Sequence, residues 1–539
     1  MTSNAEQVRK EIDASYSDNK GLKQSSTLQK VVTYILSVTS GIVLIGALVV
    51  VIVAAMAIKL PELNYNYSAS QVDIPSISSD NVCFSQPKLD DDETSNLSND
   101  EEFGATKAPT VSTSLVAERG QTSMATFGGI NSTVESGTVV KPNEALAGPE
   151  AGLTIGTSNI AGTQNFSNIF KATDVMPFGV NGIKENYTAD GDLRGLAVSQ
   201  CQQPQTDIWF LGGETSVQAT TKLILANPSP APAQVMITVW GDDTKGTLGD
   251  DGSLKYSASR YIGINGQSET SVNLSAGAAG QKILAVHIKA SATPIAATIQ
   301  TSRLEGLLPY GIEYVNQQIP AHEQIISGIN YDANGGSNTS FLNIFAPATS
   351  TDVKVHAKFI PQDVSTKPVE KDFSLTKSYV GVEDLSFLTT GFWAVELSAD
   401  TDIIANVQQT SLNAEGKREL LFSNPTVIGA QHLLTIADAD FAIVHYLGTN
   451  PIKYSVIGYD SAGKTVHNSQ IDLKPGELKV LPKASLSGAT ILSFAPPVDA
   501  KDPKIAASAL WWQLDKLAQT TSIPLQTKSS IYDFKYLLK

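Results

Sequence analysis

Short stretches in which apolar and polar residues alternate recur through the second half of the chain. Segment 233–241 (AQVMITVWG) has an apolar residue at every second position, and segment 353–359 (VKVHAKF) repeats the pattern with polar residues between. Alternation with a period of two is typical of an antiparallel strand with one buried face. Gly and Asp tolerate positive φ, so GDDG at 249–252 and DSAG at 460–463 suit turns. The pattern predicts an all-β fold of short strands.

One of these strands occurs three times. PIAATIQTS at 294–302 resembles IIANVQQTS at 403–411 and PKIAAS at 503–508, and the offset between the first two copies also aligns AVHI at 285–288 with AVEL at 394–397. A shared Ile-Ala core with variable flanks is what packing requires, so the copies indicate architecture and not a catalytic motif. A unit of roughly 100 residues is the size of a β-sandwich, whereas a propeller blade, the alternative, has roughly 40–50.

The first half of each repeat is also recognisable. LILANP at 223–228 corresponds to LNIFAP at 342–347 and to HYLGTNP at 445–451. Each copy ends in a proline, which cannot donate to a sheet and therefore suits the end of a strand. The sequence thus predicts tandem Ig-like β-sandwich repeats, about three, with a looser N-terminal one before them. The predicted boundaries are 206–312, 313–425 and 426–539 for the repeats and 109–205 for the divergent β-rich region.

A transmembrane helix is predicted at residues 31–58, where no charged residue interrupts the run. The run exceeds the roughly 20 residues needed to cross a bilayer. Lys and Arg are concentrated before it, so the positive-inside rule places residues 1–30 in the cytoplasm. A signal peptide cleaved near Ala55–Ala57 is the alternative. The prediction is a single-pass signal anchor in the cell membrane, with an extracellular C-terminal ectodomain.

Residues 59–108 are polar and acidic and read as a linker. Their run KLDDDETSNLSNDEEF at 88–103 could be a calcium loop, because Ca²⁺ prefers clustered carboxylates. The run lacks the spacing of an EF-hand, with its central Gly and terminal Glu. A solvated acidic segment is therefore the interpretation.

The chain has only two cysteines, Cys83 and Cys201. Two are too few for a structural zinc site. Disulfides persist outside the cytoplasm, so an exported chain with two cysteines favours an intramolecular Cys83–Cys201 bridge over two independent buried thiols.

The net charge of −15 argues against nucleic acid as a partner. None of the six histidines lies in a metal-binding motif, and no nucleophile elbow or phosphate-binding loop is present. Asp242–Asp243 and Asp250–Asp251 could be imagined as a glycosidase pair, but a hairpin tip offers them no enclosing cleft. The sequence therefore predicts no catalytic residues, no metal site and no cofactor.

The five tryptophans are the better candidates for binding, because sugars stack on aromatic faces. Trp393 and Trp511 lie in apolar parts of the repeat and are expected in the core. Trp240 lies on the less buried face of its strand beside a loop. Neighbours on a strand point to opposite faces, so Trp512 is expected to face away from Trp511. Trp240 and Trp512 are the candidate contacts with a glycan or a partner.

Three motifs carry a resemblance to a known family. CQQP at 201–204, WFLGG at 209–213 and LILANP at 223–228 follow the predicted span and its polar region. The combination resembles an uncharacterised family of actinobacterial membrane-anchored exported proteins with no established activity. The resemblance implies no catalytic residues. It implies a role near the envelope glycan, since genes of that family often lie beside membrane glycosyltransferases.

These observations favour a non-enzymatic, extracytoplasmic cell-envelope protein, a membrane-anchored array of β-sandwiches that acts as a scaffold or accessory factor. Its expected partners are the membrane and an envelope polymer or a membrane glycosyltransferase system. We expect such an array to be elongated. The alternative is a set of carbohydrate-binding modules that recognises cell-wall or extracellular glycan. A hydrolase or transferase hidden in the β-rich region is the third hypothesis.

Overall fold

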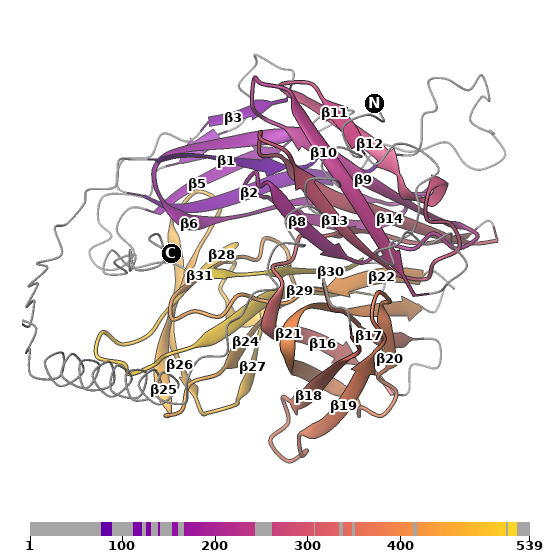
Figure 1. Ribbon diagram of the computed structural model, residues 1–539. Helices are drawn as coiled ribbons and strands as arrows, with labels where there is room; N and C mark the ends of the chain where they lie inside the picture. The colour runs from indigo at the N-terminus through magenta and orange to yellow at the C-terminus, as the bar shows by residue number, and fades with distance from the viewer. Residues whose placement is uncertain are drawn as a thin grey trace, which may run out of the picture. The chain divides into compact units, whose positions relative to one another are not determined.

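The computed structural model describes residues 77–88, 111–120, 126–130, 138–140, 153–159, 167–242, 261–306, 308–333, 338–347, 351–412, 418–513 and 516–524 (Figure 1). All of these residues belong to one compact unit, Pro75–Lys539. The predicted cytoplasmic tail and transmembrane helix, residues 1–58, lie outside the described residues. Within the described ranges, no helix is long and apolar enough to cross a membrane.

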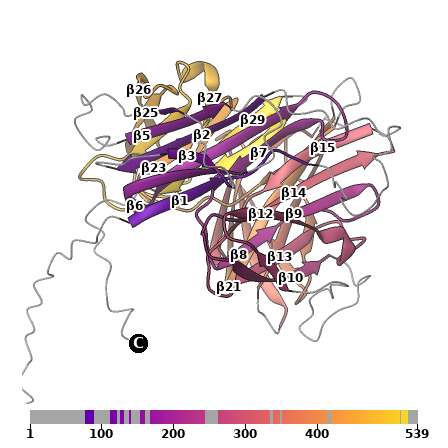
Figure 2. The ribbon, with the colours of Figure 1, turned by 90° about the horizontal axis from the view of Figure 1, so that it is seen from above.

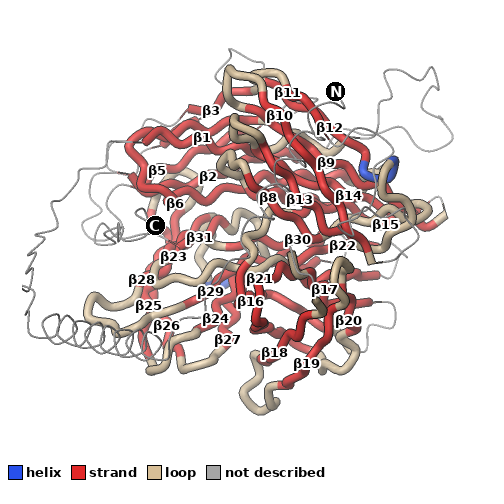
Figure 3. The backbone as a smooth tube through the Cα atoms, viewed as in Figure 1, coloured by secondary structure: helices blue, strands red, loops and turns tan. Residues whose placement is uncertain are grey.

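The protein is almost entirely β, as the alternating pattern predicted (Figure 3). Two short 3₁₀ helices, η2 (Leu274–Ala276) and η3 (Lys483–Ser485), are the only helical segments in the ranges given above. Multiple antiparallel sheets result, and their arrangement fits a series of β-sandwiches.

The N-terminal sheet has seven strands in the order β1-β6-β2-β5-β4, with β3 and β7 also paired to β6. Its longest strand, β6, pairs with four others, and β1 lies within the segment that the sequence assigned to a polar linker. The bounds are Ile77–Cys83 (β1), Val111–Gly120 (β2), Thr126–Gly129 (β3), Thr138–Val140 (β4), Leu153–Asn159 (β5), Asn168–Thr188 (β6) and Gly195–Gln200 (β7).

The next eight strands form two four-stranded sheets, β11-β10-β13-β8 and β12-β9-β14-β15, with one shared hydrophobic core. We call this pair the first module. The bounds are Asp207–Leu211 (β8), Ala219–Asn227 (β9), Ala233–Gly241 (β10), Tyr261–Ile264 (β11), Ser268–Asn273 (β12), Leu284–Ala290 (β13), Ala296–Glu305 (β14) and Leu308–Val315 (β15).

The second module is built around β21, a strand of 22 residues. Its first half pairs with β16 and β18, and its second half pairs with β17 and β22, so one strand serves two sheets. The bounds are Ala321–Tyr331 (β16), Thr339–Phe345 (β17), Val353–Pro361 (β18), Val369–Leu375 (β19), Gly381–Asp384 (β20), Gly391–Leu412 (β21) and Arg418–Ser423 (β22).

The third module has a five-stranded sheet, β26-β25-β28-β23-β31, and a four-stranded sheet, β27-β24-β29-β30. The bounds are His432–Thr435 (β23), Phe441–Tyr446 (β24), Ile452–Tyr459 (β25), Thr465–Leu473 (β26), Leu478–Pro482 (β27), Ile491–Ala495 (β28), Ile505–Gln513 (β29), Lys516–Thr521 (β30) and Ile523–Pro524 (β31).

The three modules share one strand order. The sheet order β12-β9-β14-β15 of the first module recurs as β20-β17-β21-β22 and as β27-β24-β29-β30. The strand that the sequence repeats three times is β14, the second half of β21, and β29. Its shared isoleucine is Ile404 in β21, Ile505 in β29 and Ile295 directly before β14, and all three are completely buried. The repeat therefore conserves a packing position within the chain.

The N-terminal sheet and the three modules contact one another in a closed cycle. Four edge strands, one from each module and one from the N-terminal sheet, meet in a cycle: β7 contacts β15 and β30, and β22 also contacts β15 and β30. Figure 2 labels two of these strands, β7 and β15. In a linear array each module would touch only its neighbours in sequence. The contact between β7 and β30 therefore corrects the expectation of an elongated ectodomain, because it joins the N-terminal sheet to the third module.

Candidate functional site

The four edge strands bury a charged cluster where they meet. Arg194, directly before β7, donates from Nη1 to Glu419 Oε1 over 3.0 Å. Its Nη2 donates to the carbonyl oxygens of Arg418 (2.6 Å) and Pro309 (3.3 Å). The Arg194 and Glu419 side chains are 7% and 0% exposed. One guanidinium thus links the N-terminal sheet to the first and second modules, and its charge is matched inside the protein.

A second carboxyl group lies in the same cluster. Burial raises the pKa of Glu313, on β15, well above its usual range, and the charge of Glu419 raises it further. The backbone N–H of Tyr314 opposes this shift by donating to Glu313 Oε1 over 2.8 Å. Burial and the neighbouring charge therefore both favour the protonated form of Glu313.

A glycine permits the close approach of β7 to this cluster. Gly195 has a φ of 136°, and a Cβ atom there would lie 2.7 Å from Glu419 Oε2. Any larger residue would be strained and would displace the carboxylate. The position of the buried ion pair therefore requires glycine as the first residue of β7.

Side-chain amides connect other parts of the four edge strands and the linkers beside them. Gln200 Nε2 donates to the carbonyl oxygen of Thr521 (2.9 Å), and the Gln200 backbone N–H donates to Asn316 Oδ1 (2.9 Å). Gln318 Nε2 donates to Asn424 Oδ1 (2.9 Å), and the Asn424 N–H donates to Gln519 Oε1 (3.1 Å). Each bond joins two different modules or their linkers, so the contacts satisfy polar groups that burial would otherwise leave unpaired.

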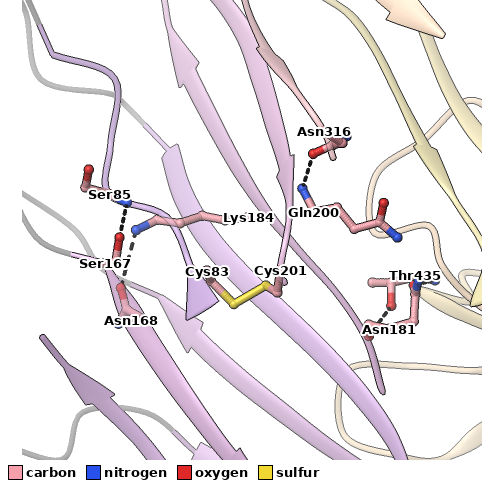
Figure 4. The surroundings of a disulfide bond; sticks show 10 residues. All are labelled: Cys83, Ser85, Ser167, Asn168, Asn181, Lys184, Gln200, Cys201, Asn316 and Thr435. Atoms are coloured by element: carbon pink, nitrogen blue, oxygen red, sulfur yellow. Dashed lines mark hydrogen bonds between the residues drawn. A yellow bond between two sulfur atoms is a disulfide. The ribbon is translucent and has the colours of Figure 1, made fainter. Parts of the chain in front are cut away.

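The predicted disulfide is confirmed. Cys83 and Cys201 are joined by an S–S bond of 2.05 Å at a sequence separation of 118 (Figure 4). Next to it, the backbones of Val82 and Gln202 exchange two hydrogen bonds, of 2.8 and 2.9 Å. The bridge ties the end of β1 to the segment that enters the first module.

The chain after Cys83 crosses a polar cluster on the first module. Glu269, on β12, accepts hydrogen bonds from Ser85 Oγ (2.7 Å), Lys88 Nζ (3.1 Å) and Ser167 Oγ. Gln300 exchanges hydrogen bonds with the Lys88 backbone, of 3.0 and 2.8 Å. We call Ser85, Lys88, Ser167, Glu269 and Gln300 the strap cluster, because they hold the segment after the disulfide against the first module.

Trp240 lies half-buried on the outer face of β10. Its ring stacks on that of Trp209 with centroids 5.6 Å apart, and the ring of Phe345, from the second module, lies 5.2 Å away. The ring of Trp209 also stacks on that of His287, with centroids 3.9 Å apart, and lies 6.3 Å from that of Phe345. The tryptophan faces thus pack mainly against protein rings, and the stack joins the first and second modules.

Trp512 is also half-buried and lies against an apolar cluster that includes Phe392 and Phe441. Its backbone N–H donates to Asp440 Oδ2 over 2.8 Å. Trp393 and Trp511, which the sequence places in the core, are each 2% exposed. The candidate contact residues Trp240 and Trp512 lie on different modules, and no contact joins them.

The described residues include no group of three or more His, Cys, Asp or Glu side chains placed to hold a metal ion. The pair with most catalytic character is His287 and Asp207, whose Nε2 and Oδ1 are 3.0 Å apart. Burial lowers the pKa of His287, and the bond to Asp207 opposes the shift. Of the four aspartates considered as a glycosidase pair, Asp243, Asp250 and Asp251 lie outside the described residues. The acidic run after Lys88 also lies outside them.

Residues 171–483 match a family of unknown function, DUF5719. The chain belongs to this family. No curated protein and no solved structure matches the chain. The DUF5719 match starts within β6 and ends at the first residue of η3. It therefore includes Cys201 and the Arg194–Glu419 pair, whereas Cys83 lies before it and β28 to β31 lie after it.

The buried charges between modules were not predicted from the sequence. One signal is present: Glu419 stands in RELLFS, where a charged residue lies beside an apolar run. A charge in such a run indicates either a solvent face or a buried pair. The sequence alone does not distinguish these cases, because the partner is far away along the chain.

Proposed function

We propose that this DUF5719 protein is a non-catalytic scaffold of the cell envelope, held outside the membrane by an anchor at residues 31–58. The proposal includes Ig-like sandwiches as the fold of the three modules and a location at the cell membrane with the ectodomain extracytoplasmic. An actinobacterial origin and an envelope-glycan or glycosyltransferase partner belong to the same proposal.

The use of the buried charges supports this function best. Arg194 and Glu419 contact each other across two parts of the protein, and Arg194 also contacts the Arg418 carbonyl, so these hydrogen bonds serve assembly. Glu313 accepts a hydrogen bond from the N–H of its chain neighbour Tyr314. A catalytic site instead places perturbed acids and bases beside an accessible reacting position. The disulfide adds support, since such bonds persist in oxidising compartments.

Topology is the first test. Intact cells that express the full chain with a tag at the C-terminus are treated with an impermeant protease, and the tag is followed by blotting. Loss of the tag from intact cells, with retention of a membrane-embedded N-terminal fragment, is expected. Full protection of the tag until the cells are lysed would rule out the exported scaffold.

Glycan binding is the second candidate, and the outer face of the sheet β11-β10-β13-β8 favours it. One row across this face consists of Tyr261, Met236, Lys289 and Asp207, which are neighbours in register. Tyr261 is 58% exposed, and the Asp207 side chain is 52% exposed. An exposed aromatic ring beside hydrogen-bonding groups suits the apolar face and hydroxyls of a sugar.

A further inference from the structure

A lysine and an asparagine side chain meet inside the N-terminal sheet. Lys184 Nζ donates to Asn168 Oδ1 over 3.3 Å, and both residues lie on β6 (Figure 4). Lys184 is 1% exposed and Asn168 is fully buried. Asn168 Nδ2 has no hydrogen-bond partner among the described residues. An amino group and an unpaired carboxamide nitrogen are both costly to bury, so the pair requires a physical explanation.

The surroundings make this amine a nucleophile. Burial lowers the pKa of Lys184 to about 8; the carboxylate of Glu269 acts against this shift and the charge of Lys88 acts with it. A deprotonated share of the amine is therefore present near neutral pH, and only the neutral amine attacks a carbonyl carbon. Glu269 also accepts a hydrogen bond from Ser167, the chain neighbour of Asn168.

We propose that Lys184 and Asn168 join in an intramolecular isopeptide bond. Lys184 Nζ attacks Asn168 Cγ, so the Nζ–Cγ bond forms and the Cγ–Nδ2 bond breaks. One proton passes from Nζ to Nδ2, which leaves as ammonia. The atoms balance without oxidant, reductant or co-reactant, and the product is a neutral secondary amide in place of a buried amine.

The folded sheet holds the two reacting groups close together before the reaction. The two side chains are held together by the folded sheet, which converts an encounter of two groups into a unimolecular step. Asn168 is also the register partner of Cys83, so the new bond would lie next to the disulfide. Two covalent links would then fasten β1, both ends of β6 and the entry to the first module at one place.

Glu269 is a positioning residue in this scheme. It belongs to β12 of the first module, whereas Lys184 and Asn168 belong to the N-terminal sheet. Its negative charge favours the cationic species formed as the amine attacks, and it accepts a hydrogen bond from Ser167, the chain neighbour of Asn168. The bond is therefore expected to form after the N-terminal sheet has docked on the first module, because Glu269 is in place only then.

Peptide mapping by mass spectrometry tests the proposal on the full-length chain extracted in detergent. The folded protein is incubated above the Lys184 pKa of about 8, denatured and digested. The expected product is a branched peptide that contains residues 168 and 184. Its mass equals the sum of the masses of the two linear peptides minus the mass of one ammonia molecule. Complete recovery of the two unmodified linear peptides would overturn the proposal, and this result needs no variant.

Three variants and one control variant test the roles of the individual residues. Lys184→Arg keeps the charge but forms no amide, so the branched peptide is expected to vanish. Asn168→Asp is expected to form the same branched peptide with loss of water, which the precursor mass of the variant reveals. Glu269→Gln is expected to slow bond formation about 100-fold, and the exposed control Glu305→Gln is expected to leave the rate unchanged. Equal rates in Glu269→Gln and the wild type would overturn the role of Glu269.

Discussion

The guanidinium of Arg194 and the carboxylate of Glu419 lie 3.0 Å apart although 225 residues separate them in the chain. Neither group is exposed to more than 7%. Arg194 comes from the linker before β7 and Glu419 from β22, so the pair closes the N-terminal sheet onto the second module. The carbonyl oxygen of Pro309 adds the first module to the same guanidinium.

Removal of one partner of this pair is expected to be severe. Arg194→Met leaves Glu419 buried without its cation, which should lower the free energy of unfolding by about 3–5 kcal/mol. Denaturant unfolding measures this difference. The matched control is Lys453→Met, whose ion pair with Asp472 is exposed to solvent and should contribute little to stability. The double variant Arg194→Met/Glu419→Gln should recover part of the lost stability, since no unpaired buried charge remains. Equal effects of Arg194→Met and Lys453→Met on the free energy of unfolding would contradict this role of the buried pair.

The disulfide should stabilise the fold mainly by restricting the unfolded chain. A loop of 118 residues corresponds to about 4–5 kcal/mol in the chain-entropy estimate. Cys83→Ser/Cys201→Ser should therefore lower the midpoint of thermal unfolding, and reduction of the wild type should have the same effect. A reduced wild type that unfolds at the temperature of the oxidised protein would show that the bridge carries none of the stability.

A buried carboxyl group should make stability depend on pH. Burial raises the pKa of Glu185 from 4.5 to about 7, and the charge of Asp438 acts in the same direction. The folded state then holds the proton more tightly than the unfolded state. Stability from this group is complete below pH 4.5 and is lost as pH rises to about 7, by about 3 kcal/mol in total.

The comparison of the wild type with Glu185→Gln isolates this effect. The free energy of unfolding is measured as a function of pH for both. Burial lowers the pKa of His432 from 6.5 to about 4, which gives the opposite slope over that interval in both proteins, so only their difference is used. The difference should grow from pH 4.5 to about 7 in favour of Glu185→Gln. A difference that stays constant with pH would contradict a protonated Glu185.

The aromatic residues on the outer face of the first module should differ in their effects. Tyr261→Ala should abolish retention on an envelope-glycan column if glycan binding is the function, with little change in unfolding temperature, because Tyr261 is exposed. Trp240→Ala should instead destabilise the protein, since Trp240 packs on Trp209 and Phe345. Retention that is unchanged in Tyr261→Ala would remove this face as the binding site.

The strands and their repetition could be predicted from the sequence because they depend on local patterns. Alternation in β10 and β18 and the repeated Ile-Ala core of β14, β21 and β29 reflect which face of a strand is buried, and this information is local. The Cys83–Cys201 pairing could be predicted for another reason: two cysteines leave only one possible intramolecular disulfide.

The contacts between modules could not be predicted in the same way. Glu419 looks like an ordinary polar position of a strand, and its partner Arg194 is recognised only when the fold brings the two residues together. Trp240 illustrates the same limit. Its place on the less buried face was predicted, but the sequence did not reveal that Trp209 and Phe345 would cover its ring.

Hydrogen exchange of the wild type and Arg194→Met tests most directly whether the four edge strands form one closed assembly. If they do, the loss of one guanidinium should reduce the protection of amides in β7, β15, β22 and β30 together, because each strand is supported by two of the others. Loss of protection confined to β7 and β22, with β15 and β30 unchanged, would contradict the closed assembly.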